Sequence, residues 1–367
     1  MKRNVFARYY YCFRSTNLYI FIFIYLICSC SNDGNQIKAE DNSKHEVVKN
    51  ILKSVSAKPE EKIKQLTHEQ LKKYTPNELG WVMVLEYHRI GKPEARWTRT
   101  PDNFRKDLSI LYKQDYYLIT LRDFVTNSIN VPLGKTPIIL TFDDATEGQF
   151  RYIKGKSEIQ IDPDSAVGII ENFCKKYQDF GKGASFYVLP RLAFGQSFEY
   201  AAKKLKFLAE NGYEIGNHTL EHTMLSTASE QKAIQAIADN ISMLHKFLPG
   251  YEVNTLAYPN GGVPKNLKIV EKGEFKGTKY KNIAALLVGS EPSVSPNSKK
   301  FKPLLIPRIQ AIQSELDKYL GLFKNYPDLQ YISDGNKDLV TIPKKIHSYL
   351  KDTLREDLKN SSKLVTY

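Results

Sequence analysis

Cysteine is scarce in this chain, and its distribution excludes a network of internal disulfides. Three of the four cysteines lie in the first 30 residues, so Cys174 is the only one in the remainder. Stability must then come from a hydrophobic core, and hydrophobic residues make up 42% of the sequence. Cys174 lies in an apolar-periodic stretch, which is typical of a buried helix residue rather than a nucleophile.

Long apolar runs are also missing near the start of the chain. The run at residues 18–27 is ten residues long, whereas a bilayer core of ~30 Å requires about 20. A basic segment without acidic residues precedes this run, as in a signal peptide. The run ends at Ile27-Cys28-Ser29-Cys30, which resembles the lipobox of bacterial lipoproteins. We therefore predict an exported, membrane-anchored lipoprotein lipidated at Cys30, with an uncleaved anchor or a plain secretory signal as the alternatives.

A concentrated basic surface is missing as well. The formal charge of +13 and the pI near 9.2 would attract polyanions in general. However, the lysines are scattered and form no stripe interleaved with aromatic residues, which a nucleic-acid-binding surface would require. We interpret the charge as a solvated surface and predict no nucleic-acid partner.

The apolar pattern divides the chain into four parts. A signal peptide at 1–30 and a polar, partly helical tether at 31–79 precede a folded domain at 80–325 and a charged C-terminal extension at 326–367, helical or frayed. Within the domain, short apolar runs alternate with segments of helical period, which predicts parallel βαβ units closing into a distorted (β/α) barrel. The predicted strands lie at 81–87, 116–120, 137–142, 184–189, 213–216, 255–258, 283–288 and 304–309, and the predicted helices at 101–114, 166–177, 201–211, 229–248 and 314–325.

Two adjacent carboxylates end one of the predicted strands, and strand ends are where a parallel barrel carries its site. Asp143 and Asp144 follow the apolar residues 138–142. Neighbours on a strand point to opposite faces, so the two can converge on one site only if the chain turns there. The pair is consistent with a base and a metal ligand, or with a helix cap beside a solvated carboxylate.

Two further segments follow predicted strands. His218 and His222 are spaced four apart and would share a face, and a metal ion, if a helical turn begins near Asn217. Tyr258-Pro259-Asn260 leads into two glycines, which predicts a tight turn whose backbone N–H groups approach a ligand closely. Taken singly, an exposed helix and an ordinary turn are the favoured explanations of these segments.

Together these segments resemble the polysaccharide deacetylase family, also called the NodB homology domain or carbohydrate esterase family 4. The motifs occur in the family's order over about residues 81–310: TFDD, ASFYV, EIGNHTLEH, AYPNGG and IPRI. The resemblance implies a metal site of Asp144, His218 and His222, occupied by Zn²⁺ with Co²⁺ or Ni²⁺ as alternatives. It also implies Asp143 as the base and the backbone N–H of Asn260, within Tyr258-Pro259-Asn260, as an oxyanion donor.

The chain departs from the family pattern at two positions. Ala257 stands where well-studied members carry an arginine, and Arg308 is predicted to supply that charge beside Asp143. The late Leu-x-His motif, whose histidine is the general acid, is absent, and His88 at the end of the first strand is the candidate by position, with a structural role as the alternative. The expected activity is deacetylation of an N-acetylated polysaccharide; an O-acetyl esterase and an inactive glycan-binding protein are the alternatives. The polymer and the oligomeric state remain open.

Overall fold

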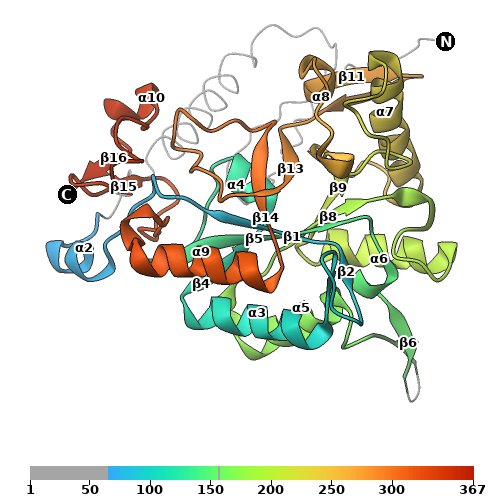
Figure 1. The fold of residues 1–367 in the computed structure, drawn as a ribbon, viewed down its shortest axis with the longest axis horizontal. Coiled ribbons are helices and arrows are strands. Elements are labelled where there is room, and N and C mark those ends of the chain that lie inside the picture. The colour runs from blue at the N-terminus through green and yellow to red at the C-terminus, as the bar shows by residue number, and fades with distance from the viewer. Residues whose placement is uncertain (1–64, 156–157) are drawn as a thin grey trace, which may run out of the picture. The chain divides into compact units, whose positions relative to one another are not determined.

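Eight parallel strands form the central sheet of the computed structural model, which describes residues 65–155 and 158–367 (Figure 1). Seven strands close into a ring in the order β1-β14-β13-β10-β9-β8-β5, because β5 pairs with β1 along its other edge; β4 lies beside the first half of β5. The predicted distorted (β/α) barrel is confirmed. The strands are β1 Met83–Tyr87, β4 Tyr116–Ile119, β5 Thr136–Asp143, β8 Ser185–Val188, β9 Glu214–Asn217, β10 Thr255–Ala257, β13 Ala284–Ser290 and β14 Ile306–Gln310.

Helices connect the strands and cover the outside of the ring (Figure 1). Six of them begin directly after a serine or threonine whose side chain accepts a hydrogen bond from the first helical turn, as at Ser165 and Ser229. Such caps satisfy backbone N–H groups that have no partner inside the helix. These six are α2 His68–Tyr74, α3 Pro101–Lys113, α4 Leu121–Val125, α5 Ala166–Lys176, α6 Phe198–Glu210 and α7 Glu230–Phe247. The other helices are α8 Lys268–Glu271, α9 Gln313–Asn325 and α10 Glu356–Lys359.

Strand β5 shows how the ring buries two different faces. Alternate residues of a strand point to opposite sides. Leu140 and Phe142 belong to the apolar layer between ring and helices, where the Phe142 ring stacks on Phe186 at 4.9 Å. Thr141 and Asp143 lie on the other face, inside the ring, and both are buried. The strand therefore delivers Asp143 to the interior at its carboxyl end.

Four two-stranded ribbons decorate the barrel. The pairs β2 with β3 and β6 with β7 follow strands β1 and β5 in the chain, so they lie near the carboxyl end of the ring. Their bounds are β2 Arg89–Ile90, β3 Thr98–Arg99, β6 Tyr152–Lys154, β7 Ile159–Ile161, β11 Lys272–Phe275, β12 Thr278–Lys281, β15 Val340–Ile342 and β16 Leu364–Thr366.

The two ends of the described chain pack together rather than extending into solvent. The compact unit begins at Gln65, earlier than the start predicted at residue 80, and residues 76–79 are buried. The backbone N–H of Glu78 donates to the carbonyl of Thr341 at 2.9 Å. Figure 1 accordingly shows α2 on the same side as β15, β16 and α10. The prediction of a helical or frayed C-terminal tail is wrong, because residues 326–367 form turns, the short 3-10 helix Pro327–Leu329, the four-residue helix α10 and the strand pair of β15 and β16.

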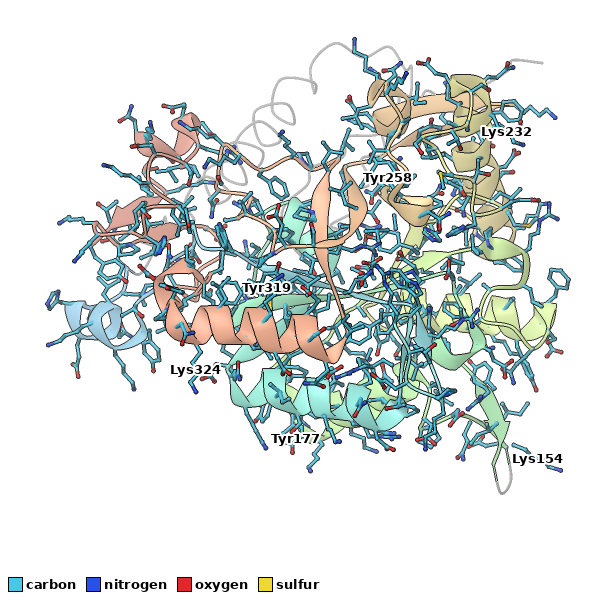
Figure 2. The ribbon with its side chains drawn as sticks, viewed as in Figure 1. Lys154, Tyr177, Lys232, Tyr258, Tyr319 and Lys324 are labelled. Atoms are coloured by element: carbon cyan, nitrogen blue, oxygen red, sulfur yellow. The ribbon has the colours of Figure 1, made fainter. Side chains whose placement is uncertain are left out.

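The predicted signal peptide, Cys30 and most of the tether lie outside the described residues. Within residues 65–155 and 158–367, none of the helices has the length and apolar character needed to cross a membrane. Figure 2 shows Lys154, Lys232 and Lys324 on separate sides of the molecule, which agrees with a dispersed positive charge.

Candidate active site

A sharp turn at the end of β5 brings the two adjacent carboxylates to one place. Asp144 and Ala145 both have left-handed backbone conformations, with φ of 74° and 50°. Such angles are unusual outside glycine and cost energy, so they are kept only where the surrounding structure enforces them. A turn at this position was the condition for both carboxylates to reach one site. It points Asp143 into the ring and Asp144 toward the loop after β9.

His218 and His222 converge through a loop, so the prediction of a helical turn near Asn217 is wrong. Thr219 and His222 have φ of 59° and 53°, which interrupt any helix. The Asn217 side chain accepts from the Thr219 N–H at 2.7 Å, and the Thr219 hydroxyl accepts from the Thr223 N–H at 2.7 Å. These side-chain bonds compete successfully with helical hydrogen bonding, as Asn and Thr commonly do.

Both imidazoles face Asp144. One oxygen of Asp144 lies 3.3 Å from Nε2 of His218 and 3.5 Å from Nε2 of His222, and the two rings are 4.8 Å apart. Nδ1 of His218 lies 2.9 Å from the Ala257 carbonyl, so it carries the proton and leaves Nε2 as a lone-pair donor.

The donor set fits a divalent metal ion. Nε2 of His218 is buried and has no hydrogen-bond partner, an arrangement that costs free energy unless another group pairs with it. Asp144, His218 and His222 place their ligand atoms within 4.8 Å of one another. Two imidazoles and one carboxylate are a common ligand set for catalytic zinc, which keeps an open coordination position.

Arg308 lies inside the ring, and both of its terminal nitrogens donate hydrogen bonds to the Asp143 carboxylate. The nitrogen–oxygen distances are 2.8 and 2.7 Å, and both side chains are buried. The same guanidinium donates to Glu86 at 3.0 Å, and Glu86 in turn accepts from the Gly289 N–H at 2.9 Å. A bidentate pair of this kind fixes orientation as well as charge.

The charges around Asp143 shift its protonation equilibrium. Burial by itself raises the pKa of Asp143, but the Arg308 guanidinium, together with the charges of His218 and His88, outweighs burial and holds that pKa well below its usual range. For Glu86 the balance is reversed: burial raises its pKa more than Arg308 lowers it. Asp143 is therefore an ionised carboxylate in a fixed position.

His88 is the third imidazole of the site. Its Nδ1 is buried without a hydrogen-bond partner, and its ring lies 4.5 Å from that of Trp97. Burial lowers the pKa of His88, with the Asp143 charge opposing the shift. The ring is thus disposed to be neutral, which allows it to donate or accept a single proton at the cavity wall.

The segment after β10 brings Asn260 to the cavity. Asn260 has a left-handed φ of 53° and lines the cavity, whereas Pro259 is buried. The Tyr258 hydroxyl donates to the Leu304 carbonyl at 2.9 Å, and its ring is buried. The Tyr258 side chain therefore has a structural contact, and Asn260 is the residue of this predicted trio that faces the site.

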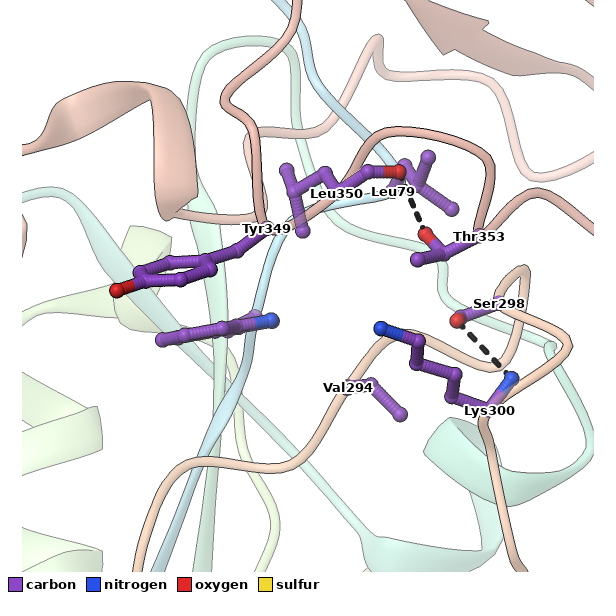
Figure 3. Close-up of a pocket in the computed structure, with 8 residues that line it drawn as sticks. Leu79, Val294, Ser298, Lys300, Tyr349, Leu350 and Thr353 are labelled. Carbon is purple, nitrogen blue, oxygen red and sulfur yellow. Dashed lines mark hydrogen bonds between the residues drawn. The ribbon is translucent and has the colours of Figure 1, made fainter.

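These groups open onto one cavity of about 610 Å³. It is lined by Asp143, Asp144 and the three histidines, and by Asn260, Val288, Arg89 and residues 95–98. A smaller cavity of about 180 Å³ lies beside the segment that enters β1, between Leu79 and Tyr349 (Figure 3). The two cavities share no lining residue, and the smaller one contains none of the predicted site residues.

Sequence reasoning missed Glu86 and Trp97. A carboxylate inside the apolar run 81–87 was a visible anomaly, because a buried charge requires a partner. Trp97 lies in a loop with no regular pattern, and nothing in the sequence placed it beside His88.

Comparisons with known proteins agree with the motifs. Residues 130–277 match the sequence profile of the polysaccharide deacetylase family. Over 131 residues the chain is 28% identical to the peptidoglycan-N-acetylmuramic acid deacetylase PdaC of Bacillus subtilis, a match that spans 36% of this chain and 23% of that protein. The structure of the Streptococcus pyogenes deacetylase PplD in complex with acetate aligns with a TM-score of 0.50 and 20% identity, over 66% of this chain and 97% of that one. A polysaccharide deacetylase from Bacillus cereus aligns with a TM-score of 0.47 and 18% identity, over 66% of this chain and 68% of that one.

Proposed function

Because the chain carries a polysaccharide deacetylase domain over residues 130–277, we propose that it hydrolyses N-acetyl groups of a cell-wall or extracellular polysaccharide in a metal-dependent reaction. Asp143, Asp144, His218 and His222 all lie within that range and converge on one cavity. The observation that carries the proposal is the buried Nε2 of His218, which forms no hydrogen bond within the described residues and lies 3.3 Å from an oxygen of Asp144.

Asp144, His218 and His222 would hold the metal, with Zn²⁺ as the first candidate and Co²⁺ or Ni²⁺ as alternatives. When bound, the ion supplies Lewis-acid chemistry to the acetamide carbonyl and to water. The carbonyl of Ala257 keeps the His218 ring in the tautomer that presents Nε2.

Asp143 would accept the proton of the attacking water. Its bidentate contact with Arg308 keeps the carboxylate ionised and aimed into the cavity. The backbone N–H of Asn260 would donate to the oxygen that becomes negative in the transition state. In its protonated form His88 would donate a proton to the departing amine and return to the neutral state that burial favours, since it is the imidazole of the cavity that is not committed to Asp144.

The substrate class and location follow the same reasoning. The PdaC match supports an N-acetylated wall glycan, although it spans less than a quarter of that protein's length. We propose further that the chain is exported and tethered to a membrane through a lipid on Cys30, as the Cys28-Ser29-Cys30 site predicts. Radiolabelled lipid should be incorporated into the wild type and not into Cys30→Ala; incorporation that depends on Cys28 instead would contradict this assignment.

Acetate release tests the activity directly. The purified chain is stripped with chelator and incubated with N-acetylated and O-acetylated glycans, with and without added Zn²⁺, Co²⁺ or Ni²⁺. We expect acetate from N-acetylated glycan only after a metal is restored. Release from O-acetylated glycan alone would identify an esterase, and binding of glycan without any release would identify an inactive glycan-binding protein.

A further inference from the structure

The wall of the active-site cavity contains two arginines that have no role in the proposed chemistry. Arg89 and Arg96 both line the cavity, together with Trp97 and Thr98. They lie on the segment that leaves β1, the strand that carries Glu86, and returns at β3. Both side chains are exposed, and both line the same cavity as Asp143 and Asp144.

The segment is held rigidly by a third arginine. Arg99 is buried and donates to Asp107 at 2.9 and 2.6 Å and to Glu94 at 2.8 Å. The other oxygen of Glu94 accepts from the Thr100 N–H at 2.7 Å and from Asn103 at 2.9 Å. Backbone bonds from Arg89 to Trp97 and from Gly91 to Arg99, both 3.0 Å, close the loop. The wall is thus preorganised without help from a ligand.

The charges of the cavity wall remain uncompensated. Glu94, the acidic residue within this loop, is fully used by Arg99, Thr100 and Asn103. Among the ion pairs of the described residues, none involves Arg89 or Arg96. In the cavity, Asp143 is neutralised by Arg308, and Asp144 faces two histidines. Two exposed positive charges therefore line the cavity, and no carboxylate of the described residues forms an ion pair with them.

An aromatic side chain, Trp97, contacts both Arg96 and His88. Trp97 is 38% exposed, its ring is 4.5 Å from His88 on one side, and the Arg96 guanidinium lies 5.0 Å from its centre. The exposed part of this ring offers an apolar surface to the C–H face of a sugar, and the Arg96 guanidinium lies against the same ring.

We propose that Arg89 and Arg96 form a subsite for an anionic substituent, a carboxylate or a phosphate, on the sugar that carries the acetamide or on its neighbour. The inference rests on the proposed function, because it places this group beside the acetamide being hydrolysed. Guanidinium groups suit this role, since their fork of N–H donors matches the oxygens of both anions. The substrate class is then an acidic N-acetylated glycan rather than a neutral one.

The test compares three N-acetylglucosamine oligosaccharides of equal length: one neutral, one bearing a carboxylate ether and one bearing a phosphate. With the full-length, metal-loaded chain, kcat/KM should be about tenfold or more higher for at least one anionic oligosaccharide. Added salt should reduce the advantage, because exposed charges are screened. The anionic oligosaccharide with the higher kcat/KM, carboxylate or phosphate, identifies the substituent.

Variants test whether the preference for anionic oligosaccharides depends on Arg89 and Arg96. Arg89→Gln with Arg96→Gln should lower the anionic-to-neutral ratio of kcat/KM toward one, chiefly through KM. Lys92→Gln is the matched control: it removes one positive charge from the same loop, but Lys92 is 72% exposed, 3.9 Å from Asp102 and outside the cavity lining, so it should leave the ratio unchanged. Equal kcat/KM for all three oligosaccharides, or an equal loss on all of them in the double variant, would overturn the proposal.

Failure of the proposed function is distinguishable from failure of the subsite. If no oligosaccharide released acetate, the deacetylase proposal would be contradicted, and titration calorimetry would then decide the subsite by itself. Anionic oligosaccharide bound about tenfold more tightly than neutral, with the difference lost in the double variant, supports it. Equal affinities overturn it.

Discussion

Asp143 and Asp144 are neighbours in the chain with different surroundings. Asp143 is buried against Arg308, whereas Asp144 is partly exposed and lies within 3.5 Å of both histidine Nε2 atoms. The left-handed turn at Asp144 separates the two carboxylates onto different partners. A proton acceptor and a metal ligand should therefore fail in different ways when they are replaced.

Asp143→Asn keeps the shape of the side chain and removes its basicity. We expect it to retain the metal and to lose about 10² to 10⁴-fold in kcat. Asp144→Asn should be metal-poor as well as inactive, because it weakens one of three protein ligands. Metal analysis beside acetate release checks both; full metal in both variants, or none in the wild type, would contradict these roles.

Arg308 and Glu86 do not take part in the proposed reaction themselves; they position Asp143. Arg308→Ala should lower kcat far more than it lowers metal content, since Asp143 would lose its orientation and both carboxylates their counter-ion. Leaving buried charges unpaired costs about 3–5 kcal/mol of stability, so thermal unfolding must accompany the kinetics. Glu86→Gln is the milder variant and should reduce kcat by roughly tenfold with metal retained. Unchanged kcat in Glu86→Gln would show that Arg308 is positioned without it.

At the scale of elements, the register of parallel strands assembles the site. Asp143 pairs with Tyr187, Tyr187 with Gly216, and Asn217 with Leu256. The carboxyl ends of β5, β9 and β10 therefore meet at one end of the ring, which is where parallel barrels place their sites. The side chains between these strands must be small enough to allow this pairing.

Gly216 makes the contact between β8 and β9 possible. A Cβ atom there would lie 2.4 Å from Cε1 of Tyr187 and 3.0 Å from Oγ1 of Thr255. Gly216→Ala is expected to lower the free energy of unfolding by about 1–3 kcal/mol through overpacking, measured by urea denaturation.

Gly321→Ala provides the control for that experiment. Gly321 lies in α9 with no atom within 4 Å of an added Cβ, so alanine should stabilise the chain by roughly 0.5–1 kcal/mol. If both substitutions changed the free energy of unfolding equally, the close approach of Tyr187 would not be the reason why residue 216 is glycine.

At the scale of the whole molecule, Glu78 joins the start of the folded unit to its end. It is 3% exposed, and its two oxygens accept from the backbone N–H groups of Thr341 at 3.0 Å and Asp334 at 3.2 Å. Glu78→Ala should cost about 1–3 kcal/mol, because it leaves two buried donors unpaired. Glu210→Ala, which removes an exposed helix carboxylate 3.7 Å from Lys206, should change stability by less than ~0.5 kcal/mol. A Glu78 effect as small as that would mean that residues 326–367 are not needed to hold this end of the barrel.

The sequence by itself determined the barrel and the identity of its chemical groups. Apolar runs and helical periods are local patterns, and each of the eight predicted runs overlaps a strand of the sheet. The order of TFDD, HTLEH and PNGG along the chain pointed to the family that the 130–277 match supports.

Only the tertiary structure decided how those groups meet. The loop geometry of His218 and His222 depends on side-chain bonds from Asn217 and Thr219, which outweigh the helical spacing of the pair. The contact of Arg308 with Asp143 and Glu86 joins residues more than 160 positions apart, and ring closure rather than local pattern brings them together. The packing of residues 326–367 on Glu78 is decided in the same way, because a segment with a weak local preference takes its conformation from the surface that it covers.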